Sequence, residues 1–159
     1  MKIVVFASGR GSNFKAIYEN IEAGTLTNIE VSLVVSDNPD ANVLAYAAEK
    51  NVPHVCVDRK SFATKEAYEE ALLAEVGKVP CNLLVLAGYM RIIGPQFLAN
   101  VGCPVVNIHP SLLPSFPGLH AQKQAVDYGV KVSGCTVHFV DTELDHGPII
   151  AQVPVPVMD

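Results

Sequence analysis

The chain has 159 residues, of which 50% are hydrophobic and 17% charged, and its formal net charge is −5 at pH 7. That length fits one domain, and the composition is typical of a globular protein rather than a disordered one. The chain contains no run of Lys or Arg, so the sequence argues against a broad surface for nucleic acid or for an anionic membrane.

Hydrophobic periodicity predicts strands that alternate with helices along the whole chain. In chain order we expect a strand at 3–7, a Gly-rich turn at 8–12, a helix at 13–23, a strand at 29–35, a polar turn at 36–40, a helix at 42–50, a strand at 52–57, a helix at 64–79, a strand at 83–87, a helix at 95–101, a strand at 105–108, a helix at 121–128, and strands at 136–140 and 148–155. The strand at 83–87 is the most apolar and is expected to be central. This alternation predicts an α/β fold, an open and mostly parallel twisted sheet with right-handed crossovers.

The apolar segments of the chain and the spacing of its cysteines predict the cellular compartment of the protein. The apolar run at 3–7 is too short for a signal peptide, and no stretch is long enough to span a bilayer. Four widely spaced cysteines, Cys56, Cys81, Cys103 and Cys135, form no C-x-x-C pair. We therefore expect reduced thiols that bind no metal in a cytoplasmic protein.

The last predicted strand is followed by too few residues to cover its face. We therefore expect residues 1–159 to form a single domain that lacks a C-terminal segment. The alternative is a short native form that covers this edge by oligomerising.

A Gly-rich turn, Gly9-Arg10-Gly11-Ser12-Asn13, joins the first predicted strand to the first helix. Backbone N–H groups at a helix start attract anions, and glycine lets a ligand come close. The turn lacks the third glycine of a dinucleotide site, and we find no carboxylate that closes a clear second strand at the expected offset. The sequence thus leaves two readings, a monophosphate site or an ordinary turn in which Ser12 or Asn13 caps the helix.

The residues best suited to catalysis are Asn107, His109 and Asp145. Asn107 and His109 alternate on a predicted strand that Pro110 ends, so their side chains leave on one face. A carboxamide and an imidazolium can both donate to an oxyanion, and a nearby carboxylate stabilises the imidazolium. Polar side chains at a strand end, and a solvated acidic loop around Asp145, are the structural alternatives.

Other motifs have both structural and functional readings. Met90, Ile92 and Ile93 follow the apolar strand at 83–87 and either line a flat apolar slot or enter the core. His120 either meets an anion or caps the following helix. His54, His138 and His146 are taken as structural, with His138 the least secure of the three, and the isomer of the Leu113–Pro114 bond stays open.

The motifs at 6–13, 86–92, 107–120, 134–140 and 144–149 together resemble the folate-dependent glycinamide ribonucleotide formyltransferases, and the resemblance covers residues 1–157. It implies a Rossmann-like sheet with helices on both faces, in a metal-free enzyme of purine synthesis whose co-substrate is 10-formyltetrahydrofolate. It also implies a cytoplasmic monomer or weak homodimer that binds glycinamide ribonucleotide, and neither nucleic acid nor membrane.

The resemblance also assigns roles to particular residues. Gly11, Ser12 and Asn13 are expected to hold the ribonucleotide phosphate, while Asn107 and His109 face the formyl oxygen with Asp145 beside His109. The folate is expected to contact the residues Lys65, Met90, Arg91, Ile92, Ile93, Asn107, Val140 and Asp145. Lys65 stands where the family often has Arg, and Thr142 where an acid is common, with Asp141 as a possible substitute.

The same motifs leave rival functions open. A formyltetrahydrofolate hydrolase would use water in place of the amine, and a methionyl-tRNA formyltransferase would need a basic extension. The family continues beyond residue 159 with a helix that contributes to the pocket. A non-catalytic module that binds folate or a nucleotide is therefore the third alternative.

Overall fold

The computed structural model describes residues 1–158, whose backbone contacts divide the chain into two compact units, Met1–Val105 and the residues from Val106 onward. The first unit contains β1 (Lys2–Phe6), α1 (Ser12–Glu22), β2 (Glu30–Ser36), α2 (Asn42–Glu49), β3 (His54–Cys56), the 3-10 helix η1 (Arg59–Ser61), α3 (Lys65–Val76), β4 (Leu83–Leu86) and α4 (Pro95–Asn100). The second contains nearly all of β5 (Val105–His109), followed by α5 (Ala121–Tyr128), β6 (Val132–Phe139) and β7 (Ile149–Pro156). Every strand and helix expected from the periodicity is therefore present.

The strands of the first unit form a parallel sheet in the order β3-β2-β1-β4. Val5 of β1 lies opposite Val34 of β2 on one side and Val85 of β4 on the other. Such strands are buried on both faces, which explains their continuous apolar runs. β4 is not an edge, because the Leu84 N–H donates to the Pro104 carbonyl at 3.0 Å.

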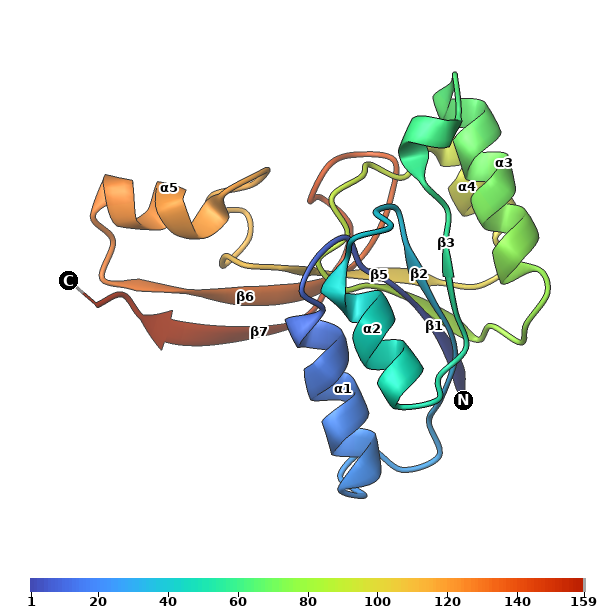
Figure 1. Cartoon of the computed structure of the whole chain (residues 1–159). Coiled ribbons are helices and arrows are strands. Elements are labelled where there is room, and N and C mark those ends of the chain that lie inside the picture. The colour runs from blue at the N-terminus through green and yellow to red at the C-terminus, as the bar shows by residue number, and fades with distance from the viewer. Residues whose placement is uncertain (159) are drawn as a thin grey trace. The chain divides into compact units, whose positions relative to one another are not determined.

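Helices cover both faces of these strands, as expected (Figure 1). α1 and α2 lie on one side, where the Phe14 ring packs against Tyr46 with the centroids 5.8 Å apart. α3 and α4 lie on the other side, where Phe6 packs against Phe97 at 6.0 Å. Phe6, Phe14 and Phe97 are fully buried, so one aromatic contact joins α1 to α2 and another joins α4 to β1.

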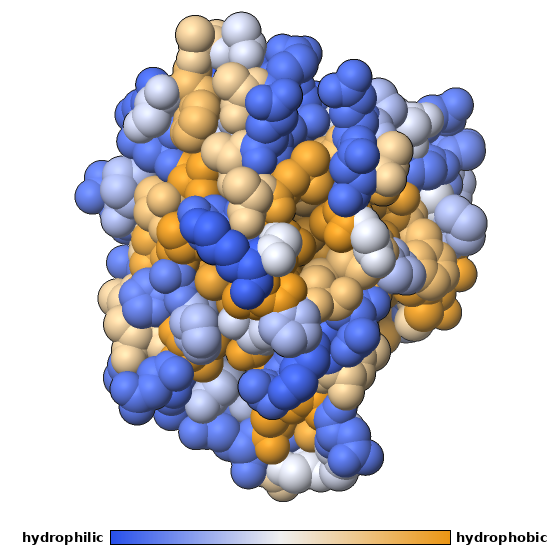
Figure 2. Space-filling view, turned by 90° about the vertical axis from the view of Figure 1, so that its right-hand side faces the viewer, coloured by the Kyte–Doolittle hydropathy of each residue, from blue (hydrophilic) through white to orange (hydrophobic). Residues whose placement is uncertain are grey.

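The outer surface mixes residue types. Figure 2 shows the face that lies to the right in Figure 1, where hydrophobic and hydrophilic residues are interspersed. None of the helices in residues 1–158 has both the length and the apolar character that a membrane crossing requires.

The strands of the second unit pair in antiparallel fashion, a detail that the expectation of a mostly parallel sheet left open. β6 pairs with β5 through Asn107–His138 and His109–Thr136, and with β7 through pairs such as Val137–Ala151. The α/β, Rossmann-like class is confirmed, with three parallel pairs in the first unit and two antiparallel pairs in the second.

Several element boundaries also differ from the predicted ones. β6 begins at Val132, four residues before the predicted start, and Gly134 lies within it. A Cβ atom at Gly134 would lie 2.1 Å from the Val153 carbonyl, so the glycine permits the close pairing with β7. β3 is shorter than expected, and β5 reaches His109, where Pro110 ends it. That residues 1–159 form one domain stays a prediction, and Asp159 lies outside the described residues.

Candidate active site

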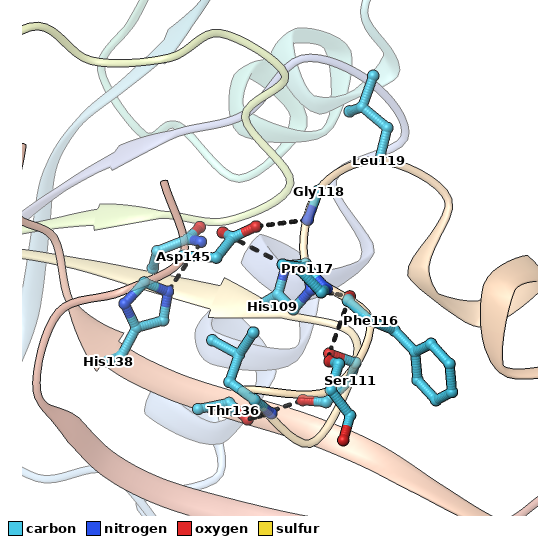
Figure 3. Close-up of polar contacts among 12 residues, drawn as sticks. His109, Ser111, Phe116, Pro117, Gly118, Leu119, Thr136, His138 and Asp145 are labelled. Atoms are coloured by element: carbon cyan, nitrogen blue, oxygen red, sulfur yellow. Dashed lines mark hydrogen bonds and ion pairs between the residues drawn. The ribbon is translucent and has the colours of Figure 1, made fainter. Parts of the chain in front are cut away.

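His109 and Asp145 form a buried polar pair in the second unit (Figure 3). Asp145 Oδ1 lies 3.5 Å from His109 Nδ1, and the two side chains are only 7% and 6% exposed. The other carboxylate oxygen of Asp145 accepts a hydrogen bond from the Gly118 N–H at 2.7 Å. Asp145 has a left-handed φ of 50°, which is uncommon for a residue other than glycine, and these two contacts hold it there.

The second ring nitrogen of His109 is also occupied. His109 Nε2 lies 2.9 Å from the Phe116 carbonyl oxygen, which can only accept, so Nε2 carries a proton. Both ring nitrogens of His109 thus face an oxygen atom that can accept a hydrogen bond.

Asn107 is held by a histidine that the sequence reading treated as structural by default. His138 Nδ1 lies 3.0 Å from the Phe139 carbonyl and must donate to it, so Nε2 of a neutral ring is free to accept. Asn107 Nδ2 lies 3.2 Å from that Nε2. One amide hydrogen of Asn107 is thus used to fix the carboxamide, and the other is left to donate to a ligand.

A network of hydrogen bonds fixes the chain that follows Pro110. Thr136 Oγ1 donates to the Ser111 carbonyl at 2.7 Å and accepts from the Leu113 N–H at 3.0 Å. Gln152 Nε2 donates to the Leu113 carbonyl at 2.9 Å, which ties the same segment to β7. The Leu113–Pro114 bond, which the sequence left open, is cis. Residues from β5, β6 and β7 together thus position the loop whose Phe116 carbonyl meets His109.

In the loop between β6 and β7, the acids other than Asp145 lie at the surface. Asp141 Oδ2 lies 3.0 Å from His146 Nδ1, and the hydrogen bond from His146 lowers the pKa of Asp141. The same bond raises the pKa of His146, to which Glu143 also contributes. Thr142 is exposed and Val140 is half-buried. Asp145 is thus the carboxylate of this loop that turns inward.

The Gly-rich loop belongs to the first unit. α1 begins at Ser12 and its N-cap is Gly11, with a φ of 75° and no capping side chain. The suggested capping role of Ser12 or Asn13 is therefore wrong. A Cβ atom at Gly11 would lie 2.6 Å from Val43, so only glycine fits this turn. Ser12 is exposed and Asn13 is half-buried, and the first-turn N–H groups have no acceptor within the helix.

Residues 88–93 follow β4 in the first unit. Met90 and Ile92 are 61% and 63% exposed, whereas Ile93 is 6% exposed and lies in the core. Met90 and Ile92 are therefore exposed enough to line an apolar slot, whereas Ile93 belongs to the core. The Met90 N–H donates to Ser8 Oγ at 2.8 Å, which joins this segment to the end of β1.

Arg91 has a partner that sequence reasoning missed. Its Nε donates to Asp37 Oδ2 at 2.7 Å, and the Asp37 side chain is 4% exposed. Asp37 directly follows β2, so a carboxylate does stand at the end of the second strand, contrary to the expectation from the sequence. The hydrogen bond that Arg91 donates to Asp37 raises the pKa of Arg91. A cavity of about 320 Å³ borders this pair and is lined by Ser8, Asp37, Asn38, Pro39, Asp40, Asp58, Lys60 and Arg91.

Lys65 begins α3, and its ammonium group lies 3.8 Å from Glu69. Glu69 is buried and accepts a hydrogen bond from the Gly94 N–H at 2.8 Å, which holds the end of the 88–93 segment. Because the Lys65 side chain is 45% exposed, it remains accessible to an anionic ligand.

His120 and His54 lie in the second and the first unit, respectively. His120 stands at the N-cap of α5 with a φ of 56°, and its side chain makes no capping bond. The His120 ring therefore does not form the helix cap that the sequence suggested. His54 Nδ1 lies 2.9 Å from the Val52 carbonyl.

The predicted site residues fall into two groups. Asn107, His109, Val140 and Asp145 belong to the second unit, and the phosphate loop, Lys65 and residues 90–93 belong to the first. In residues 1–158 no three His, Cys, Asp or Glu side chains gather as metal ligands, and the metal-free reaction stays a prediction.

Comparison with known proteins gives one consistent result. The model of a family described as formyl transferase matches residues 1–159. The chain is 45% identical to a phosphoribosylglycinamide formyltransferase of Bacillus subtilis, over 95% of this chain and 77% of that protein. It is 40% identical to the trifunctional purine biosynthetic protein adenosine-3 of Drosophila melanogaster, over 99% of this chain and 12% of that protein. The crystal structure of the Bacillus halodurans phosphoribosylglycinamide formyltransferase superposes with a TM-score of 0.94 at 43% identity, over 100% of this chain and 81% of that one.

Proposed function

We propose a function for this chain from one premise: it belongs to the formyl transferase family. Its reaction is the transfer of the formyl group of 10-formyltetrahydrofolate to the amine of glycinamide ribonucleotide, a step of purine biosynthesis. The relatives' names supply the acceptor, and the family's co-substrate supplies the formyl group. The observation that carries the proposal is the buried pair of His109 and Asp145, 3.5 Å apart, on the motifs that resemble this family.

Formyl transfer needs a donor for the oxygen of its tetrahedral intermediate. An imidazolium at His109 and the free amide hydrogen of Asn107 are two such donors, each worth about 3–4 kcal/mol in a well-formed oxyanion site. Asp145 faces Nδ1, so Nε2 is the nitrogen that turns to the formyl oxygen. The Phe116 carbonyl, now 2.9 Å from Nε2, has to move aside when the substrate binds.

The bonds and protons of the reaction balance without a further reagent. The amine of the ribonucleotide, as free base, forms the new C–N bond to the formyl carbon. The bond from that carbon to N10 of the folate then breaks, and the proton lost by the amine is taken up by N10. Asp145 sustains the positive charge of His109 while the oxyanion exists, and it can relay the proton through water.

Residues of the first unit are proposed to bind the substrates. The N-terminus of α1, at Gly11, Ser12 and Asn13, suits a phosphate because its N–H groups have no acceptor within the helix. Met90 and Ile92 offer exposed apolar side chains to the pterin. Arg91 and Lys65 supply positive charge for the anionic tail of the folate.

One assay tests the proposal. The protein is supplied with 10-formyltetrahydrofolate, with and without glycinamide ribonucleotide, and the release of tetrahydrofolate is followed. We expect release that depends on the amine and yields one formylated ribonucleotide for each tetrahydrofolate.

The alternatives give different outcomes in the same assay. Release at an equal rate without the amine would identify a hydrolase, and absence of release with retained folate binding would identify a non-catalytic module. Either outcome would overturn the transferase.

A further inference from the structure

Two cysteines that are distant in sequence meet in the first unit, at positions that precede β4 and β5. Cys81 precedes β4 and Cys103 precedes β5, 22 residues further along the chain. Their sulfur atoms lie 2.9 Å apart, and both residues are half-buried. The hydrogen bond from the Leu84 N–H to the Pro104 carbonyl fixes the two chain segments beside each other.

The separation of the sulfurs suits a covalent bond better than a metal. The bond length of a disulfide is about 2.05 Å, so the two atoms need to close by less than an ångström. Two thiolates on a tetrahedral zinc ion lie about 3.8 Å apart, given Zn–S bonds of about 2.3 Å. Within residues 1–158 no third or fourth ligand completes a metal site around the pair.

We propose that Cys81 and Cys103 are a redox modification site, a dithiol that a low-molecular-weight disulfide converts reversibly into an intramolecular disulfide. In the first step one protein thiolate attacks the small disulfide, forms a mixed disulfide and releases one small thiol. In the second step the other protein thiolate attacks the mixed disulfide and releases the second small thiol. Two protein thiols are thereby oxidised, and one small disulfide is reduced to two thiols.

The ionisation of the pair sets how readily it reacts. Burial raises the pKa of Cys81 to about 12, and the neighbouring Cys103 acts in the same direction. The thiolate is the reacting form, so Cys81 reacts slowly at neutral pH and the cross-link needs sustained exposure to the oxidant.

The disulfide would close a loop that contains residues 88–93 and α4. The cross-link lies before the first residue of β4, whereas the 88–93 segment follows its last residue. It therefore constrains the unfolded chain without replacing any side chain proposed to contact a substrate.

The positions of Lys and Arg make the cross-link directly detectable. Trypsin cleaves after Lys78, Arg91 and Lys123, so Cys81 and Cys103 leave on separate peptides, 79–91 and 92–123. After incubation with oxidised glutathione, we expect a digest made without reductant to contain the two peptides joined. Their joint mass should be lower by two hydrogens, and dithiothreitol should separate them.

Stability gives a second readout. We expect the oxidised protein to unfold at a midpoint several degrees higher than the reduced one, because the closed loop lowers the entropy of the unfolded chain. Cys81→Ser and Cys103→Ser should abolish both the joined peptide and the shift. The matched controls Cys56→Ser and Cys135→Ser should retain both, because neither sulfur belongs to the pair.

Three results would overturn the proposal. Glutathione could remain on either sulfur of the wild-type protein with no joined peptide. The cross-link could involve Cys56 or Cys135, or the joined peptide could form without any rise in the unfolding midpoint.

Discussion

The charge of one imidazole ring is the feature on which the proposed chemistry depends. His109 donates through Nε2 to the Phe116 carbonyl, and its Nδ1 lies 3.5 Å from the Asp145 carboxylate. The Gly118 N–H fixes the carboxylate at 2.7 Å, and His138 fixes the Asn107 amide. Each proposed donor is thus oriented by a second residue, as a preorganised oxyanion site requires.

Replacing Asp145 by Asn tests that charge. The amide oxygen can still accept from the Gly118 N–H, but the negative charge beside His109 is lost. We expect kcat to fall by roughly 10² or more, with a small change in the KM for either substrate.

Asp127→Asn serves as the matched control, because Asp127 is 60% exposed and pairs with Lys123 on α5. Near-normal kcat in Asp145→Asn would remove Asp145 from the chemistry. So would an equal loss of activity in the control.

At the scale of elements, the 88–93 segment is held by anchors from three different parts of the first unit. Ser8, at the end of β1, accepts from Met90, Asp37 after β2 accepts from Arg91, and Glu69 of α3 accepts from Gly94. Asp37 Oδ1 is buried and has no hydrogen-bond partner among the described residues. A segment held in this way can present its exposed apolar side chains in one arrangement.

Asp37→Asn should loosen this segment. The substitution removes the charge that faces Arg91, and a hydrogen bond to a charged group is worth about 1.5–3 kcal/mol. We expect the KM for 10-formyltetrahydrofolate to rise by about tenfold, while the KM for the ribonucleotide and kcat change little.

The neighbouring carboxylate Asp40 is exposed and offers a matched control as Asp40→Asn. An unchanged folate KM in Asp37→Asn, or a change confined to the ribonucleotide, would show that Asp37 does not position the folate segment.

At the scale of the whole molecule, buried acids that are neutral at pH 7 make the fold sensitive to alkali. The hydroxyl groups of Tyr68 and Tyr89 lie 2.5 Å apart in the core, where they join α3 to the 88–93 segment. Burial raises the pKa of Tyr68 to about 12 and also raises the pKa of Tyr89. An unfolded tyrosine loses its proton near pH 10.

Stability should therefore fall as the pH rises from about 10 to about 12. In that window the unfolded chain binds fewer protons than the folded one, so the free energy of unfolding decreases with pH. Urea unfolding in the presence of reductant should show this slope, and Tyr68→Phe together with Tyr89→Phe should flatten it. A slope that is the same in the double variant would assign the alkaline sensitivity to other groups.

Local patterns in the sequence predicted the elements well, because periodicity and turn residues act within a few positions of the chain. Pro110 ends β5, and the apolar run at β4 marks an interior strand. The direction of β6 and β7 escaped prediction, because an antiparallel pairing depends on partners chosen through the fold.

The missed site contacts have the same cause. Asp37 and Arg91 are 54 residues apart, Asn107 and His138 are 31 apart, and Cys81 and Cys103 are 22 apart. No local pattern marks such pairs. Sequence predicts that His109 and Asp145 meet, because both motifs follow predicted strands and together resemble a family, and the structure places them 3.5 Å apart.

The most direct test of the account is the rate of tetrahydrofolate release, measured with glycinamide ribonucleotide present and then absent. A formyl transferase that uses this amine should release tetrahydrofolate many times faster when the ribonucleotide is present, with formylated ribonucleotide formed in equal amount. A ratio of one between the two rates would contradict the account.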